Sequence, residues 1–166
     1  YINRVTDSYG FYQFAKSLIS SGFIGSGIFN QEPGYSYFLA FTIKLFGDNI
    51  YYIRFLQIII GSLTVVIIYF IGLKMFKNIL PALAGAALIS FCGVAVYYNM
   101  LLLRTFLSGF SVSAAILLFF IAAEKKRNLL FLFCSGVASG FAFFIQPNFI
   151  SIIISAIIPL VLQKNK

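Results

Sequence analysis

The sequence predicts an all-α membrane protein, a multi-pass bundle of transmembrane helices that follows a more polar opening segment. Of its 166 residues, 61% are hydrophobic and 10% are charged, and the mean hydropathy is +0.98. Soluble domains contain about a quarter charged residues, so this composition indicates a membrane protein. Residues 1–48 differ from the rest because they mix Gly, Ser, Pro, Asn and charged residues with aromatics.

The net charge of +8 does not indicate a nucleic-acid-binding surface. Such a surface needs its Lys and Arg on one solvent-facing stripe, whereas here they stand at the ends of apolar runs. That placement is typical of residues that set membrane topology and contact lipid headgroups. Cys92 and Cys134 lie inside apolar runs and the chain has no His, so neither a disulfide framework nor a His/Cys metal site is predicted.

The first predicted helix follows the start signal Thr6-Asp7-Ser8 and ends at Gly22. One side of it carries polar residues, and the other side is apolar at helical spacing. We expect this short helix to lie flat at the membrane surface. The apolar positions are Phe11, Phe14, Ala15 and Leu18.

A second short helix is predicted from Tyr35 to Phe46. Pro33 suits its first turn, where the missing N–H costs nothing, and Gly47 suits its end. About 12 residues cannot cross a hydrocarbon core that takes about 20. This helix is therefore expected to be interfacial or re-entrant, which makes residues 1–48 a loop with two interfacial helices.

Residues 49–166 are predicted to form a transmembrane bundle of about five crossings. The expected crossings are residues 49–73, 79–98, 101–123, 129–145 and 149–162.

The short loops on one side of this bundle carry seven basic residues, so the positive-inside rule makes that side cytoplasmic. The loop of residues 1–48 then faces the extracytoplasmic side of the cell membrane. Because the sequence starts at Tyr1 and ends directly after an apolar run, we expect a fragment of a longer chain. The basic residues are Lys74, Lys77, Lys125, Lys126, Arg127, Lys164 and Lys166.

Asp7 is the main candidate for chemistry, because it is a carboxylate at the start of an interfacial helix. In that position it could accept a proton from an attacking hydroxyl or amine. An N-cap is the commoner role for an Asp at a helix start, and the two roles are compatible.

Three further charged residues precede or flank apolar segments. Glu32 could be a solvated loop carboxylate or form a salt bridge to Lys44 or Arg54. Arg54 and Arg104 lie near the outer ends of crossings, where arginine either snorkels to headgroups or pairs with an anion. A guanidinium offers a lipid phosphate a bidentate pair of donors.

These residues occur in a pattern that resembles the amino-terminal part of the GT-C membrane glycosyltransferases. The resemblance is to the dolichyl-phosphate-mannose protein mannosyltransferases and the bacterial aminoarabinose lipid A transferases. Its specific motifs end by Phe76, and the rest of the chain matches by hydropathy and topology. The motifs are Thr6-Asp7-Ser8, Glu32-Pro33-Gly34-Tyr35-Ser36-Tyr37-Phe38-Leu39-Ala40, Leu45-Phe46-Gly47, Arg54 and Gly61-Ser62-Leu63-Thr64.

The resemblance implies an inverting sugar transfer from a polyprenyl-phosphate donor to a protein, lipid or glycan acceptor at the outer membrane face. It implies that Asp7 activates the acceptor, and that Glu32 and Arg54 hold positions of family residues. We assign Glu32, Arg54 and Arg104 to substrate binding. No cofactor is certain, and a divalent metal is possible.

The chain departs from the family pattern at three places, which bear on metal and phosphate binding. Ser8 stands where many relatives have Glu, and Arg104 stands where an acidic residue is common. Gln146-Pro147 replaces an expected Arg-Pro.

Two other functions compete with the transferase. A transporter or flippase component for a lipid-linked sugar or small solute would place charge near the bilayer midplane, whereas the predicted crossings are nearly free of charge away from their ends. A structural membrane subunit without activity is the third interpretation.

Overall fold

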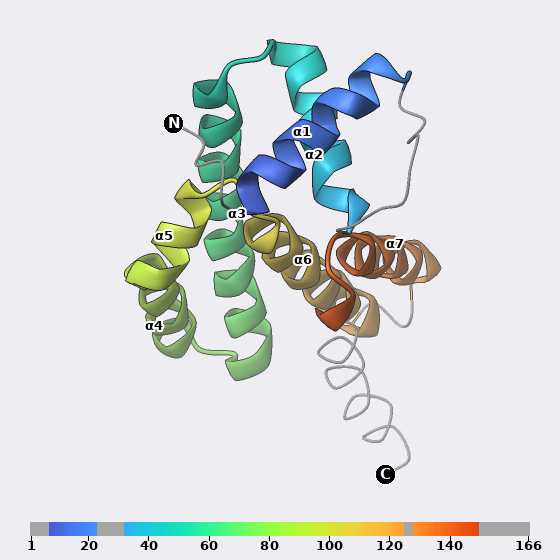
Figure 1. The fold of residues 1–166 in the computed structure, drawn as a ribbon. Coiled ribbons are helices and arrows are strands. Elements are labelled where there is room, and N and C mark those ends of the chain that lie inside the picture. Colours follow the sequence, from blue (N-terminus) through green and yellow to red (C-terminus); the bar gives the residue numbers. More distant parts are fainter. Residues whose placement is uncertain (1–6, 23–31, 125–127, 150–166) are drawn as a thin grey trace.

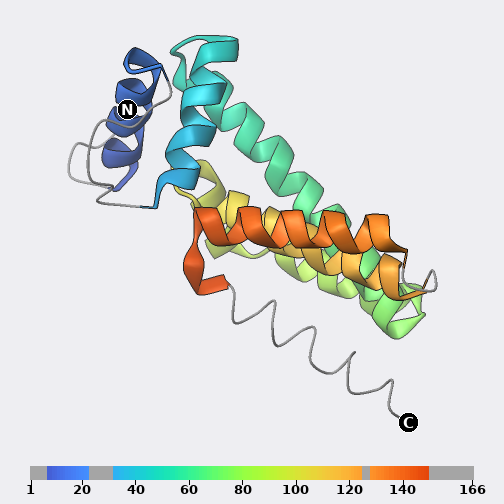
Figure 2. The ribbon, with the colours of Figure 1, turned by 90° about the vertical axis from the view of Figure 1, so that its right-hand side faces the viewer.

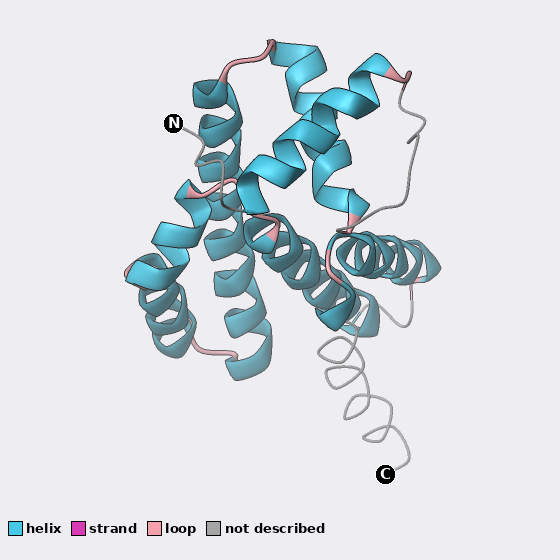
Figure 3. Cartoon of the chain, in the orientation of Figure 1, coloured by secondary structure: helices cyan, strands magenta, loops and turns pink. Residues whose placement is uncertain are grey.

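The computed structural model describes residues 7–22, 32–124 and 128–149, and every regular element in these ranges is a helix (Figure 3). This confirms the predicted all-α class. In chain order the elements are α1 (Asp7–Ser20), α2 (Pro33–Phe46), α3 (Ile50–Phe76), α4 (Ile79–Ser90), α5 (Gly93–Met100), α6 (Thr105–Glu124), α7 (Leu129–Ile145) and the short 3-10 helix η1 (Pro147–Phe149).

Helices α3 and α6 are long and apolar enough to cross a membrane, and the apolar helices α4 and α7 are shorter. Helix α6 packs on α7 and on α3, and α3 also packs on α4 (Figure 1). Many large apolar side chains on these helices are exposed, which suits contact with lipid rather than water. Examples are Phe55, Leu63, Leu80, Leu88, Leu130 and Phe133.

The predicted crossing at residues 79–98 is wrong in one respect, because it is divided into two helices. Helix α4 ends at Ser90, and α5 begins only at Gly93. Between them Cys92 has an extended backbone, with φ −70° and ψ 101°. Ser90, Phe91, Cys92 and Gly93 are all weaker helix formers than Ala or Leu, and this run favours a break here. The turn that we expected around Tyr97, Tyr98, Asn99 and Arg104 falls at residues 101–104, between α5 and α6. The predicted crossing at 149–162 lies outside the described residues apart from Phe149.

The two ends of the bundle carry different elements (Figure 2). Helices α1 and α2 lie at one end, together with the start of α3, the start of α6 and the end of α7. The opposite end holds Lys74 and Lys77, and there Lys74 pairs with Glu124. Among the described residues, α1 and α2 thus lie at the end of the bundle opposite these lysines. Which end faces the cytoplasm stays a prediction.

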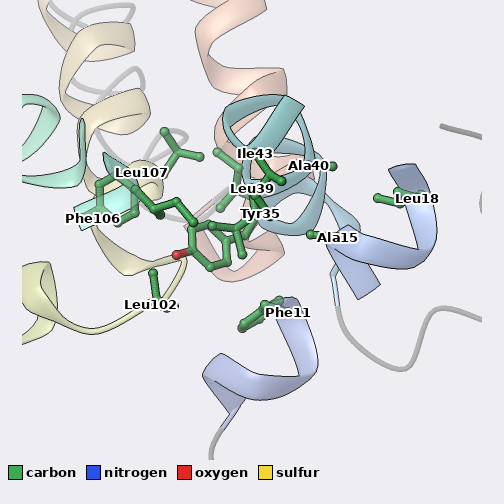
Figure 4. Close-up of a cluster of buried hydrophobic side chains, with 12 residues drawn as sticks. Phe11, Ala15, Leu18, Tyr35, Leu39, Ala40, Ile43, Leu102, Phe106 and Leu107 are labelled. Atoms are coloured by element: carbon green, nitrogen blue, oxygen red, sulfur yellow. The ribbon is translucent and has the colours of Figure 1, made fainter. Parts of the chain in front are cut away.

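Helix α1 buries its apolar face against α2. Phe11, Ala15 and Leu18 are almost fully buried there, as their helical spacing predicts (Figure 4). Burying a side chain such as Phe or Leu contributes about 1.5–3 kcal/mol. Contacts with α2 thus occupy the face that we expected to lie on the membrane, and a membrane-surface position for α1 stays a prediction.

Tyr35 of α2 lies at the centre of this cluster and is fully buried. Its ring packs edge to face on Phe11 of α1, with the centroids 5.1 Å apart, and on Phe106 of α6, at 6.0 Å. Aromatic pairs of this geometry stabilise by about 0.5–1.5 kcal/mol beyond their buried area. One side chain therefore joins the loop helices to the bundle.

The start of α2 also approaches the end of α7 very closely. A Cβ added at Gly34 would lie 2.8 Å from the carbonyl oxygen of Phe144 and 2.9 Å from Cα of Ile145. Only glycine permits this approach without a shift of the backbone. The contact fixes the position of the preceding residue pair, Glu32 and Pro33, relative to the bundle.

Candidate functional site

The residues predicted to carry function all lie at the end of the bundle that holds α1 and α2 (Figures 1 and 2). Asp7 is the first residue of α1, and Glu32 is the N-cap residue of α2. Arg54 lies in the second turn of α3, and Arg104 directly precedes α6. Their common position follows from the antiparallel arrangement of helices, which returns the chain to this end repeatedly.

Glu32 and Arg104 form an ion pair. The side chain of Glu32 is 33% exposed and that of Arg104 is 28% exposed, so neither is desolvated completely. Glu32 makes no capping hydrogen bond to α2. One predicted alternative for Glu32 was a salt bridge to Lys44 or Arg54. Glu32 does form a salt bridge, but its partner is Arg104. The pair joins the start of α2 to the segment before α6.

Arg104 also contacts α1. Its guanidinium carbon lies 5.8 Å from the centroid of the Phe11 ring, within the range of a cation–π interaction. Phe11 follows Asp7 by one helical turn, so the exposed carboxylate end of α1 lies in the neighbourhood of Arg104. A carboxylate in the first turn also stabilises α1, because the helix dipole is positive there.

Arg54 is half-buried on α3, and its Nε atom is buried without a hydrogen-bond partner among the described residues. One turn further along α3, Gln57 is fully buried. Its amide nitrogen donates to the hydroxyl of Tyr35 at 3.1 Å and to the carbonyl oxygen of Leu101 at 3.2 Å. Burial raises the pKa of Tyr35 above its usual value, so this hydroxyl stays neutral.

Gln57 was not among the predicted site residues, although the sequence carried a signal for it. It is a polar side chain inside the otherwise apolar run from Phe55 to Ile60. Buried polar groups need hydrogen-bond partners, so such a residue indicates either a functional position or a contact between elements. Its partner Tyr35 belongs to the motif from Glu32 to Ala40 that carries the family resemblance, but no role was predicted for it.

Gln146, which stands where the family pattern has Arg, lies at this end of the bundle as well. The buried hydroxyl of Ser108 is 3.2 Å from Oε1 of Gln146. Ser108 follows Arg104 by one turn of α6. The end of α7 is thereby joined to the helix that carries Arg104.

A polar cluster on the surface holds α1 to the loop between α2 and α3. Nζ of Lys16 lies 2.7 Å from the carboxylate of Asp48, and Tyr12 donates a hydrogen bond to the same carboxylate. The hydrogen bond from Lys16 is the main reason that the pKa of Asp48 is lowered. The same contact raises the pKa of Lys16.

Within residues 7–22, 32–124 and 128–149, no group of three or more His, Cys, Asp and Glu side chains could hold a metal ion. The carboxylate of Glu32 is engaged by Arg104. A divalent metal stays a prediction. The described side chains include two cations, Arg54 and Arg104, and an exposed carboxylate, Asp7, at one end of an apolar bundle.

Comparison with known proteins identifies the family. No curated protein and no solved structure matches the chain. A family model described as dolichyl-phosphate-mannose-protein mannosyltransferase matches residues 30–166, which is more than half of the chain. The match includes Glu32, Arg54 and Arg104, and it begins after Asp7. A family of transferases favours an enzyme over the transporter and the structural subunit. The chain belongs to the dolichyl-phosphate-mannose-protein mannosyltransferase family and is a membrane glycosyltransferase.

Proposed function

We propose that this protein transfers a sugar, with inversion, from a polyprenyl-phosphate donor to an acceptor at the extracytoplasmic face of the membrane. The main support is the gathering of Asp7, Glu32, Arg54 and Arg104 at the end of the bundle opposite Lys74 and Lys77. By the positive-inside rule, the lysine end is cytoplasmic. The charged end would then face the outside.

The apolar surface of the bundle explains why such a reaction takes place in a membrane. The tail of a polyprenyl phosphate is insoluble in water, so the donor must reach the protein from the lipid phase. Helices α3, α4 and α7 expose large apolar side chains that lipid can contact. The phosphate of the donor would meet the charged end of the bundle at headgroup level.

Arg54 and Arg104 would bind the donor phosphate. Arg104 has N–H donors beyond those that Glu32 can accept, and the terminal N–H groups of Arg54 are further donors. Charge accumulates on the phosphate as it leaves, and preorganised cations at that position stabilise the transition state. Glu32 competes with the phosphate for Arg104, and once displaced it could accept a hydrogen bond from a sugar hydroxyl.

Asp7 would act as the general base. The acceptor oxygen attacks the anomeric carbon on the face opposite the phosphate, and its proton passes to the carboxylate of Asp7. The bond between the anomeric carbon and the phosphate oxygen breaks, and the electron pair leaves with the phosphate. This sequence inverts the anomeric configuration.

The proposal is tested by Asp7→Asn in membranes that contain the protein, with a polyprenyl-phosphate mannose as the first donor. General-base catalysis contributes about 10²–10⁴-fold, so transfer should fall by that factor. Asp48→Asn is the matched control, because Asp48 is another carboxylate at the same end that binds Lys16 and has no role in the reaction. Undiminished transfer by the Asp7 variant would remove Asp7 from the mechanism.

A further inference from the structure

Gln57 joins three elements of the candidate site from inside the bundle. It belongs to α3, and its amide nitrogen donates to Tyr35 of α2 and to the carbonyl of Leu101, in the segment that leads to Arg104. A carbonyl oxygen can only accept, so the contact with Leu101 determines which end of the amide is the nitrogen. Oε1 of Gln57 is therefore the amide atom that takes part in neither of these two hydrogen bonds.

Two buried polar atoms on this side of α3 have no hydrogen-bond partner among the described residues, namely Oε1 of Gln57 and Nε of Arg54. Buried polar groups in folded proteins are nearly always paired, either with protein or with ordered water. Arg54 precedes Gln57 by one helical turn, and Cβ atoms at that spacing lie about 5–6 Å apart. One of the two atoms is a donor and the other an acceptor.

A hydroxyl is the complement of such a pair, because its oxygen accepts one hydrogen bond and donates another. Gln57 has no exposed surface, which favours the smallest hydroxyl compound, a buried water molecule. We infer that one water molecule bridges Nε of Arg54 and Oε1 of Gln57, and that Gln57 is thereby a positioning residue for Arg54.

The consequence concerns the other nitrogens of Arg54. With Nε and Gln57 held by the water, the orientation of the planar guanidinium is fixed, and its terminal N–H groups remain to bind an anion. Gln57 also holds Leu101, so the same amide influences the approach to Arg104. This second part, the positioning of Arg54 toward a lipid phosphate, rests on the proposed function.

The bridge itself is tested by a double-mutant cycle on thermal unfolding of the purified protein in detergent. Arg54→Lys keeps the charge and removes the Nε–H donor, and Gln57→Met keeps the length and removes the amide. If the two residues share a water, the unfolding midpoint of the double variant falls by less than the sum of the decreases measured for the two single variants. Additive losses would overturn the inference.

Two further variants keep this test decisive. Thr64→Val, combined with Gln57→Met, is the matched control pair, because the Thr64 hydroxyl bonds within α3 to the carbonyl of Ile60 at 3.0 Å. That pair should be additive. If Gln57→Met does not fold, Gln57→Glu replaces it. The introduced carboxylate keeps a hydrogen-bond acceptor for Arg54. Arg54→Lys should therefore cost more stability in the Gln57→Glu background than in the wild type. An equal or smaller cost would overturn the inference.

Binding of undecaprenyl phosphate to the same proteins tests the positioning role without any need for activity. At metal sites, loss of a residue that orients a ligand typically weakens binding about 10–100-fold, so by analogy Gln57→Met should raise the dissociation constant by about tenfold. Thr64→Val should leave it unchanged. Coupling in unfolding without a change in binding would keep the water bridge and reject the positioning of Arg54 by Gln57. A change in binding without coupling would reject the bridge.

Discussion

Substitution of Gly34 by Ala tests how the contact between α2 and α7 holds the candidate site. A Cβ at this position meets a carbonyl oxygen at 2.8 Å and a Cα atom at 2.9 Å, both in the backbone of α7, and the Phe144 ring at 2.9 Å. The ring can rotate away, but the two backbone atoms cannot. The start of α2 must therefore move away from α7.

The expected cost follows from these contacts. Forcing an extra carbon into a packed contact costs about 1–3 kcal/mol. Alanine recovers at most about 1 kcal/mol, because it is a better helix former than glycine. A cost at the middle of that range, about 2 kcal/mol, less a recovery of about 0–1 kcal/mol leaves a net loss of about 1–2 kcal/mol. At about 2–4 °C per kcal/mol for a chain of this size, the unfolding midpoint should fall by about 2–8 °C. Since Glu32 precedes Gly34 by two residues, the shift should also weaken the ion pair with Arg104.

The assay is thermal unfolding in detergent, with undecaprenyl phosphate binding measured on the same samples. Gly109→Ala is the matched control, because Gly109 also lies in a helix at this end of the bundle, and a Cβ there meets nothing within 4 Å. That variant should be unchanged or slightly more stable. If Gly34→Ala behaved in the same way, the close packing of α2 on α7 would be refuted.

Two further predictions concern charged pairs. Glu32→Gln removes the carboxylate that competes for Arg104, so undecaprenyl phosphate should bind severalfold more tightly while sugar transfer slows; weaker binding would show that Glu32 helps to hold the phosphate. Asp48→Asn should lower the unfolding midpoint slightly at neutral pH, because the contact with Lys16 lowers the pKa of Asp48 below its ordinary 3.8. A lowered pKa means that the stabilisation is complete above the unfolded value and is lost as the pH falls through the folded one, so the difference from the wild type should begin to shrink near pH 3.8 and vanish only below the folded pKa. A difference that does not shrink as the pH falls below 3.8 would exclude the charge of Asp48 as its cause.

Much of the fold could be predicted because its signals are local. Pro33 opens α2, and Gly22 and Gly47 have positive φ values of 68° and 84° after their helices, as the predicted stops require. The spacing of Phe11, Ala15 and Leu18 correctly predicted which face of α1 is apolar, although that face packs on α2. Caps, turns and helical spacing act over a few residues, so the sequence expresses them directly.

The contacts that assemble the candidate site could not be predicted in the same way. Glu32 pairs with Arg104 rather than with Lys44 or Arg54, which are nearer to it in the sequence. Gln57 donates to Leu101, 44 residues away. Such partners depend on how helices cross and on loop conformation, which no local pattern specifies.

The sequence by itself determined an all-α membrane protein, the two short helices before the bundle, and the separation of Asp7 from Lys74 and Lys77. Hydropathy and charge determine these properties, because they govern how each segment partitions between lipid and water. Only the tertiary structure decided that Glu32 and Arg104 pair, that Tyr35 and Gln57 join α2 to α3, and that α1 packs on α2 through its apolar face. These outcomes depend on packing between distant segments, where shape and buried hydrogen bonds select one arrangement among many with the same hydrophobic pattern.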